Sequence, residues 1–279
     1  MSYKTITVHL DDGPRCAARV ELAARLATRF DSRLVGIAPT GLPDVILTMN
    51  SAVPDGVECV ALSAAYLRER AQAAAKAFEQ RCSATGVASF QSSVVVDEAI
   101  DAVVRMGRCS DVIVLGQTDT NAAVDGVAFD FPQQVLLHAG APVLVIPYAG
   151  SFPSLGRRAL VAWKNTREAA RALRDALPLL RVAEHVFLVE IGEVKAELPY
   201  DNTLDAASAW LTSHGVEFKT HRELGLAGVG DQLLARAADL GVDLVVSGGY
   251  GHSRLREWVL GGTTRHLLQH MPVPTLLSH

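Results

Sequence analysis

The chain has 279 residues, of which 49% are hydrophobic, 20% charged and 6% aromatic. At roughly 100–200 residues per domain, this length predicts two domains, and the apolar content excludes a disordered chain. The formal net charge of −4 excludes a general electrostatic attraction to nucleic acid. Because no apolar run approaches the roughly 18 residues that span a bilayer, and the first residues lack a signal-peptide pattern, we expect a soluble, cytoplasmic protein that does not contact membranes.

The first half of the chain predicts strands separated by helical and loop segments. Residues 39–63 contain several prolines and glycines and predict a long loop. The apolar segment "CSDVIVLG", residues 109–116, predicts a strand that ends at a glycine. A last short strand is expected in "PVLVIP", residues 142–147, and residues 148–158 predict a linker to the second half.

The second half alternates strands and helices more clearly. Apolar runs predict strands at residues 158–163, 185–191, 216–224, 242–248 and 274–278. Helical spacing predicts helices at residues 166–180, 201–215, 228–241 and from about residue 263. Thr166 is a polar cap for the first of these helices, and Gly215 ends the second. Alternating elements with strands that are apolar throughout predict a doubly wound α/β fold, in which helices cover both faces of a parallel sheet.

The two halves repeat one another. The segment at residues 109–116 matches "GVDLVVSG", residues 241–248, at an offset of 132 positions that holds for over thirty residues. This offset carries Asp111 onto Asp243 and Gly116 onto Gly248. The amino ends of the halves also correspond, at an offset of 153. We therefore predict two tandem α/β domains, residues 1–150 and residues 151–279.

A glycine-rich segment of the second half is a candidate phosphate site. The candidate residues are Gly248, Gly251, Gly261, Gly262, Thr263 and Thr264. In a doubly wound sheet, ligands bind beyond the carboxyl ends of the strands, where a glycine turn leads into a helix. The glycines would let the backbone approach an anion, and the helix start would offer N–H groups and hydroxyls. Arg254 and Arg256, between the glycines, would screen a polyphosphate. The alternative is that these residues serve turn geometry and helix capping alone.

The first half provides an internal comparison for this segment. Its matching positions carry Asp119, Phe129, Asp130, Phe131 and Pro132 in place of Gly251, Gly261, Gly262, Thr263 and Thr264. Of the four glycines, only Gly116 is kept there, so the fold by itself does not require the others. The two aspartates would repel a phosphate. We therefore expect the first half not to bind the ligand in the same way.

At this point the sequence resembles a known family. The spacing Gly248-x2-Gly251-x9-Gly261 is similar to the nucleotide motif of universal stress proteins. Residues 161–180 and 261–277 resemble the opening and closing segments of that family, and the resemblance covers nearly all of both halves. It implies two tandem Rossmann-like domains, each with a five-stranded parallel sheet, related by a pseudo-twofold.

The resemblance also implies a ligand and a mode of association. Some universal stress proteins bind ATP or AMP, which implies an adenine nucleotide here, with or without Mg²⁺. Domains of this family pair through their last strands, which here are residues 142–147 and 274–278. These strands would otherwise be exposed sheet edges. We therefore expect an internal pseudo-dimer, and a homodimer of chains is a further expectation.

Two departures from the family pattern fall in the second half. The family places a Ser or Thr after the third glycine, where this chain has Gly262, so that Thr263 or Thr264 would supply the hydroxyl. It also places an aspartate at the end of the first strand, where this chain has Lys164, two residues after Ala162. We expect the Lys164 ammonium to reach a phosphate or to form an internal ion pair. Lys164 and Ala162 complete the expected nucleotide site.

The sequence leaves three functions open. The first is a stress-response module that binds an adenine nucleotide in the second domain and acts on an unknown protein partner. The second is a slow ATPase or phosphotransferase that uses His252 or the pair Asp11 and Asp12, where Asp11 keeps the family's position. Mutual repulsion would raise the pKa of one aspartate, and the alternative is a solvated turn. The third is a structural protein without a ligand.

Several histidines, cysteines and tryptophans are further candidates for contact with a metal ion or a nucleotide. A surface loop is the alternative for His252, which follows the second glycine. His266 and His270 lie four residues apart on one predicted helix, but no third metal ligand accompanies them, and the four cysteines have no zinc-like spacing. We therefore predict no metal site. Trp163 and Trp210 are expected to pack in the second core, with contact to adenine as the alternative.

Overall fold

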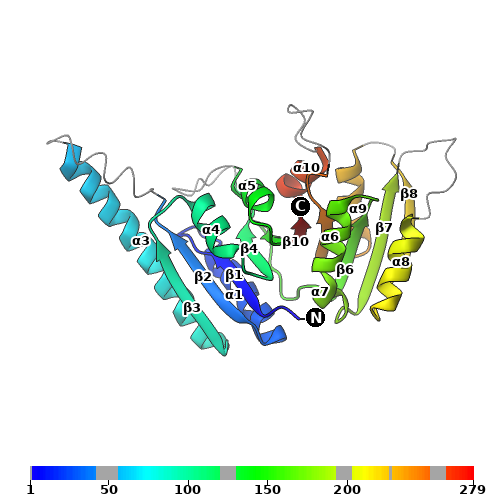
Figure 1. Cartoon of the computed structure of the whole chain (residues 1–279), viewed down its shortest axis with the longest axis horizontal. Helices are drawn as coiled ribbons and strands as arrows, with labels where there is room; N and C mark the ends of the chain where they lie inside the picture. The colour runs from blue at the N-terminus through cyan, green and yellow to red at the C-terminus, as the bar shows by residue number, and fades with distance from the viewer. Residues whose placement is uncertain (1, 42–55, 120–129, 193–202, 226–227, 252–261) are drawn as a thin grey trace. The chain divides into compact units, whose positions relative to one another are not determined.

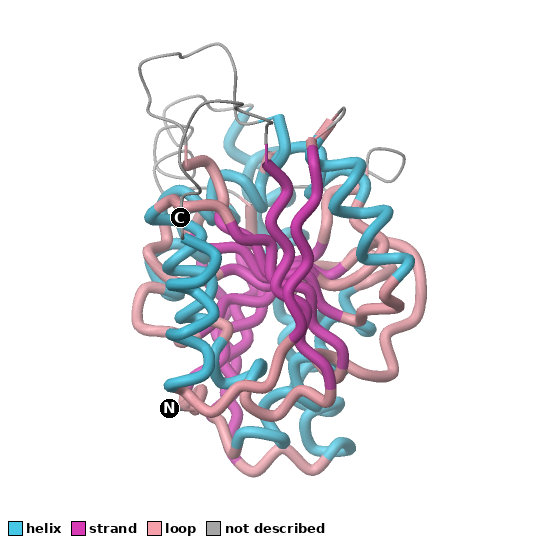
Figure 2. Tube along the Cα trace, turned by 90° about the vertical axis from the view of Figure 1, so that its right-hand side faces the viewer, coloured by secondary structure: helices cyan, strands magenta, loops and turns pink. Residues whose placement is uncertain are grey.

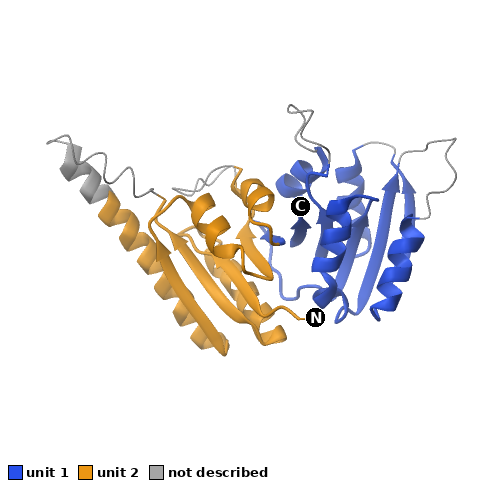
Figure 3. Cartoon of the chain, viewed as in Figure 1, with its two compact units in different colours: residues 1, 142–279 blue, residues 2–141 orange. Residues whose placement is uncertain are grey.

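A computed structural model of the chain describes residues 2–41, 56–119, 130–192, 203–225, 228–251 and 262–279 (Figure 1). Two compact units make up the fold, an amino-terminal unit at Ser2–Ala141 and a carboxy-terminal unit at Pro142–His279 (Figure 3). In the described residues, no helix is both long and apolar enough to cross a membrane.

The amino-terminal unit is a parallel sheet with helices on both faces. Its strands are β1 (Thr5–His9), β2 (Arg33–Pro39), β3 (Ser89–Val95) and β4 (Val112–Gly116), in the order β3-β2-β1-β4. Its helices are α1 (Cys16–Phe30), α3 (Gly56–Thr85), α4 (Ala99–Gly107) and α5 (Phe131–His138). Helices α1 and α3 pack together on one face, and α4 and α5 pack together on the other.

The carboxy-terminal unit repeats this arrangement. Its strands are β5 (Val143–Ile146), β6 (Arg158–Trp163), β7 (His185–Gly192), β8 (Lys219–Leu224), β9 (Leu244–Gly248) and β10 (Thr275–Ser278). Its helices are α6 (Arg167–Asp175), α7 (Leu177–Leu180), α8 (Thr203–Ser213), α9 (Val229–Asp239) and α10 (Gly262–His270). The strand order is β5-β10-β9-β6-β7-β8, and every pair is parallel except β5 with β10. Figure 2 shows the twisted strands with helices to either side.

The core of the carboxy-terminal unit fixes where its helices lie. Buried Leu160 of β6 and Val245 of β9 pack against Leu233 of α9 and Leu267 of α10. Helix α6 packs against β6 and β9 from the opposite face. The predicted doubly wound α/β fold is thus confirmed, with five strands from each repeat in the described part of the chain.

The last strands of the two repeats pair with each other, as expected. Strand β10 runs antiparallel to β5, with Leu276 opposite Leu144. Because of this pairing, β5 lies in the carboxy-terminal unit, and the compact units divide between residues 141 and 142. The boundary at residues 150–151, which follows the sequence repeat, remains a prediction.

Two sequence expectations about local structure were wrong. Helix α3 begins at Gly56, so part of the loop predicted for residues 39–63 is helical. The last helix-breaking residues of that stretch are Pro54 and Gly56, and the alanine-rich sequence beyond them favours a helix. The helix predicted for residues 166–180 divides into α6 and α7, because Pro178 stands in the first turn of α7.

The repeated aspartates Asp111 and Asp243 have the same structural role. Asp111 Oδ2 accepts hydrogen bonds from the backbone N–H groups of Lys4 (2.6 Å) and Thr5 (2.8 Å), where β1 begins. Asp243 accepts them from Arg157 (3.2 Å) and Arg158 (2.9 Å), where β6 begins. Each carboxylate therefore joins the start of its unit's β4 or β9 to the start of the neighbouring central strand. This explains why the sequence repeats the residue.

We predict that removing either carboxylate destabilises only its own unit. Asp111→Ala should lower the free energy of unfolding of the amino-terminal unit by about 1–2 kcal/mol, because two charge-assisted hydrogen bonds are lost at a partly solvated site. Hydrogen exchange should show the loss of protection in β1, and Asp243→Ala should show it in β6. Asp111→Asn, which keeps one acceptor oxygen, should cost less. Equal loss of protection in both units would contradict this assignment.

Candidate functional site

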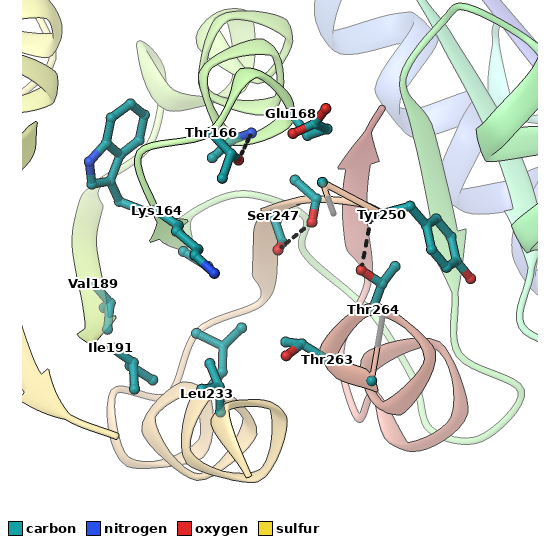
Figure 4. Close-up of a pocket in the computed structure, with 17 residues that line it drawn as sticks. Lys164, Thr166, Glu168, Val189, Ile191, Leu233, Ser247, Tyr250, Thr263 and Thr264 are labelled. Carbon is teal, nitrogen blue, oxygen red and sulfur yellow. Dashed lines mark hydrogen bonds between the residues drawn. The ribbon is translucent and has the colours of Figure 1, made fainter. Parts of the chain in front are cut away.

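A pocket of about 320 Å³ lies at the carboxyl ends of β6, β7 and β9, where α6 and α10 begin (Figure 4). This is the edge at which ligands bind in doubly wound sheets, and the volume lies within the range of small-molecule sites. The pocket belongs entirely to the carboxy-terminal unit. The expected site edge and the observed cavity therefore coincide.

The structure brings most of the predicted site residues to this pocket. Its lining includes Ala162, Lys164, Gly248, Gly251, Gly262, Thr263 and Thr264. Gly261, and the loop residues His252, Arg254 and Arg256, lie outside the described residues. The clustering supports the predicted site, and ligand binding there remains a prediction.

One wall of the pocket is apolar and was not identified from the sequence. It is formed by Val189 and Ile191 at the end of β7 and by Val229 and Leu233 of α9. In Figure 4 the side chains of Val189, Ile191 and Leu233 lie on the side of the pocket away from Glu168. The strand order places β7 next to β6, which brings these residues to the site. A sequence does not reveal strand order, so only the apolar end of the strand at residues 185–191 was a signal.

The segment after β9 is held against the start of α10. The Tyr250 N–H donates a hydrogen bond to Thr264 Oγ1 (3.2 Å), and the Thr264 side chain is buried. Tyr250 has φ 57°, a left-handed conformation that is uncommon for a residue with a side chain. Thr264 therefore serves mainly to shape the turn. Thr263 is only partly buried and also lines the pocket.

The start of α6 forms the polar end of the pocket. Thr166 caps the helix, because its Oγ1 accepts a hydrogen bond from the Ala169 N–H (3.3 Å). Glu168, in the first turn, is only 6% exposed and also lines the pocket. Burial alone would raise the pKa of Glu168, but hydrogen bonds from its own N–H and from Arg167 lower it below its usual value. The sequence alone does not single out Glu168, because nothing local distinguishes it from a surface helix residue.

The glycines of the site differ in what they permit. A Cβ at Gly248 would lie 2.5 Å from the backbone nitrogen of Ala169, so this glycine allows β9 to touch α6. A Cβ at Gly251 would lie 2.6 Å from Glu168 Oε2, and a Cβ at Gly262 would meet no described residue within 4 Å. Packing therefore accounts for Gly248, which also lines the pocket, and a role of this glycine toward a ligand remains a prediction. No described residue packs against that position of Gly262, so packing within the described part of the chain does not account for this glycine.

In the amino-terminal unit, the matching position is filled by the protein itself. A Cβ at Gly116, the counterpart of Gly248, would lie 2.5 Å from Arg19 Nη1. The buried Arg19 donates hydrogen bonds to Asp11 Oδ2 (2.7 Å) and to the His9 carbonyl (2.9 Å). Phe131, the counterpart of Thr263, packs on the His9 ring with 4.7 Å between ring centroids. The cavity beside His9 and Asp11 measures only about 20 Å³.

The acidic pair Asp11 and Asp12 does not behave as the catalytic hypothesis required. Burial alone would raise the pKa of Asp11, but Arg19, His9 and a hydrogen bond from the Gly13 N–H lower it instead. Asp12 turns to a different cation, Arg70, at 2.6 Å. The expectation that mutual repulsion raises one pKa is therefore wrong for Asp11. The Arg19 guanidinium lies 2.7 Å from the Asp11 carboxylate and stabilises its charged form.

The remaining candidates have other contacts. His266 Nε2 lies 3.0 Å from Asp231 Oδ1 and its ring stacks on His270. Within the described ranges, no group of three or more His, Cys, Asp or Glu side chains could hold a metal ion. Trp163 lines the pocket, and its buried Nε1 has no hydrogen-bond partner among the described residues. Trp210 lies on α8 against the ring of His214.

Comparison with known proteins finds a family that matches the second half of the chain. The sequence profile of the Universal stress protein family matches residues 156–279, which include the whole pocket. The universal stress protein Slr1230 of Synechocystis sp. is 24% identical over 193 residues, which are 68% of this chain and 66% of that protein. The match thus spans slightly less than two thirds of that relative's length.

Solved structures share the fold over nearly the whole chain. A universal stress protein from Archaeoglobus fulgidus DSM 4304 aligns with a TM-score of 0.72 at 15% identity, over 98% of this chain and 95% of that chain. A Pseudomonas aeruginosa PAO1 protein of unknown function aligns with a TM-score of 0.66 at 15% identity, over 99% and 92% of the two chains. Residues 156–279 thus match the universal stress protein family, and the resemblance recognised in the sequence is confirmed for this part of the chain.

The glycine contacts predict a difference in stability between two alanine variants. Gly248→Ala should destabilise the carboxy-terminal unit by about 1–3 kcal/mol, because the new Cβ meets backbone atoms that cannot move aside. Gly262→Ala should change stability by less than about 0.5 kcal/mol. All three tryptophans lie in residues 151–279, so urea unfolding followed by their fluorescence measures this unit. Equal stability of the two variants would contradict the contact at Gly248.

The buried His9 predicts an acid-sensitive amino-terminal unit. Burial lowers the pKa of His9 to about 4, so the unfolded chain binds a proton at higher pH than the folded chain does. The contribution of the neutral His9 ring to the free energy of unfolding is therefore complete above about pH 6.5. It falls by about 3 kcal/mol as the pH drops from about 6.5 to 4. Hydrogen exchange of β1 and β2 across this range should record the fall. His9→Ala should flatten it, whereas His138→Ala, at an exposed histidine of the same unit, should leave it unchanged.

Proposed function

We propose that this chain is a stress-response module that binds an adenine nucleotide, ATP or AMP, in the pocket of its carboxy-terminal unit. The observation that carries the proposal is that the pocket has an apolar wall on one side and is also lined by the start of helix α10. A purine base suits the wall formed by Val189, Ile191 and Leu233. The start of α10, with Gly262 and Thr263, suits a phosphate because its N–H groups carry the positive end of the helix dipole.

Lys164 supports a phosphate ligand at this site. It stands at the end of β6, lines the pocket and extends toward its centre (Figure 4). An ammonium attracts a phosphate, whereas an aspartate at the same position would serve a sugar hydroxyl. The change from the family's aspartate therefore shifts this position from the nucleoside toward the phosphate.

The proposal confines binding to the carboxy-terminal unit. In the amino-terminal unit Arg19 occupies the space beside Gly116, and Phe131 covers His9. A nucleotide would have to displace a buried guanidinium from its carboxylate, which is strongly unfavourable. We propose that this unit serves as a structural or regulatory partner, through which the chain acts on a protein still to be identified.

Binding without rapid hydrolysis fits the described residues best. The pocket's carboxylate, Glu168, has a lowered pKa and is held by Arg167, which makes it a weak base. Asp11, the other candidate, belongs to the filled site of the other unit. Mg²⁺, if it accompanies the nucleotide, would neutralise phosphate charge beside Glu168. We therefore propose a binding protein with at most a slow ATPase activity.

The test is nucleotide titration of a variant that imitates the amino-terminal unit. The double change Gly262→Asp and Thr263→Phe installs the residues found at positions 130 and 131. Calorimetry with ATP, ADP and AMP should show micromolar or tighter binding to the unaltered chain and at least a tenfold loss in the variant. Thr212→Phe, at an exposed position of α8, is the matched control and should bind normally.

Two outcomes would overturn the proposal. The first is the absence of heat with all three nucleotides at concentrations that detect micromolar binding. The second is undiminished affinity in the double variant, which would place the ligand elsewhere. An added Cβ at Gly262 meets no atom of the described residues within 4 Å, so the variant should keep its fold, and tryptophan fluorescence during urea unfolding checks this.

A further inference from the structure

A carboxylate closes the polar end of the pocket. Glu168 Oε2 lies 2.6 Å from the position that a Cβ on Gly251 would occupy, so the carboxylate rests against the glycine segment. In Figure 4 Glu168 and Thr166 lie at the end of the pocket opposite Val189, Ile191 and Leu233. Any ligand that extends from the apolar wall past the start of α10 therefore approaches this carboxylate.

This carboxylate is a fixed negative charge. Its Oε1 accepts a hydrogen bond from Arg167 Nε (3.0 Å) and lies 2.9 Å from Arg167 Nη2 in an ion pair, which holds it in place. The Arg167 side chain is 71% exposed, so water screens its charge, whereas the Glu168 side chain is 8% exposed and lines the pocket. The carboxylate thus lines the pocket itself, whereas the charge of its partner stands mostly in water.

Among the described lining residues, the charges are balanced between Lys164 and Glu168. One phosphate next to the start of α10 would meet the helix N–H groups, and the Lys164 ammonium, which lines the same pocket, would attract it. A second and a third phosphate would extend the anion toward Gly251 and Glu168, where like charges repel. Each added phosphate therefore meets more repulsion than the one before it.

We propose that Glu168 makes this pocket select adenine nucleotides with one phosphate over those with two or three. The inference rests on the proposed function, because it concerns the same pocket and the same class of ligand. It assigns a role in specificity to a residue outside the glycine motif. A divalent cation that bridges Glu168 and the phosphates would reduce the selectivity.

The test is calorimetry with AMP, ADP and ATP in a chelating buffer free of divalent cations. The unaltered chain should bind AMP at least tenfold more tightly than ATP, with ADP between them. Glu168→Gln should reduce the preference to less than about threefold, mainly by tightening ATP binding. Glu168→Asp, which keeps the charge, should retain a preference for AMP.

The matched control is Glu184→Gln. It makes the same change of charge in an exposed ion pair with Arg157, at the start of β7 rather than at the pocket end. It should leave the AMP preference as it is in the unaltered chain.

A measurement on the unaltered chain keeps the inference testable if Glu168→Gln fails to fold. Raising the salt concentration from 50 to 500 mM shortens the range of electrostatic forces. If repulsion sets the preference, ATP affinity should rise relative to AMP affinity. If attraction by basic groups dominates, the relative affinity of ATP should fall, and the inference is then wrong.

The outcomes separate the inference from the function beneath it. ATP binding as tight as AMP binding in the unaltered chain, or a preference unchanged by Glu168→Gln, overturns the selectivity and leaves nucleotide binding intact. No binding of any of the three nucleotides overturns both.

Discussion

The pocket depends on one close contact, between the backbone of β9 at Gly248 and the backbone of α6 at Ala169. Two backbones can lie this near only where no side chain separates them, so a glycine is required on the strand. The contact holds Thr166 and Glu168 beside the segment that follows β9. The polar end of the pocket is therefore built by backbone packing, and its side chains take the positions that this packing leaves open.

The two repeats share one architecture but differ in whether it holds an open pocket. Asp111 and Asp243 hold the same strands together in each unit, so the scaffold is common to both. Beside Gly116, however, the space is taken by the Arg19 guanidinium, which neutralises the buried Asp11. Because the Arg19 guanidinium is already paired with a buried carboxylate, it offers little space and little attraction to an anion from outside the protein. The cavity of the carboxy-terminal unit measures about 320 Å³, against about 20 Å³ beside His9 and Asp11, and this difference is why the two units differ in proposed function.

The balance of charge in the open pocket follows from its construction. Lys164 is placed by the end of a central strand, and Glu168 is placed by the first turn of a helix on the neighbouring face. These positions lie on different sides of any ligand that follows the pocket from its apolar wall. The scaffold can therefore attract a phosphate at one point and repel it at another. Such an arrangement discriminates between ligands by their number of charges as well as by their shape.

The sequence by itself determined the fold class, the repeat and the location of the glycine segment, because these depend on periodicity and on local backbone preferences. The prediction of a loop up to residue 63 was wrong, because the helix propensity of the alanine-rich sequence that follows outweighs the prolines and glycines nearby and α3 begins at Gly56. Only the tertiary structure decided that Val189 of β7 forms the apolar wall, that Arg19 fills the other unit and that Glu168 faces Gly251. These facts depend on which strands are neighbours and which helix faces meet them. Strand order and helix packing join residues far apart in the chain, and no local pattern records such contacts.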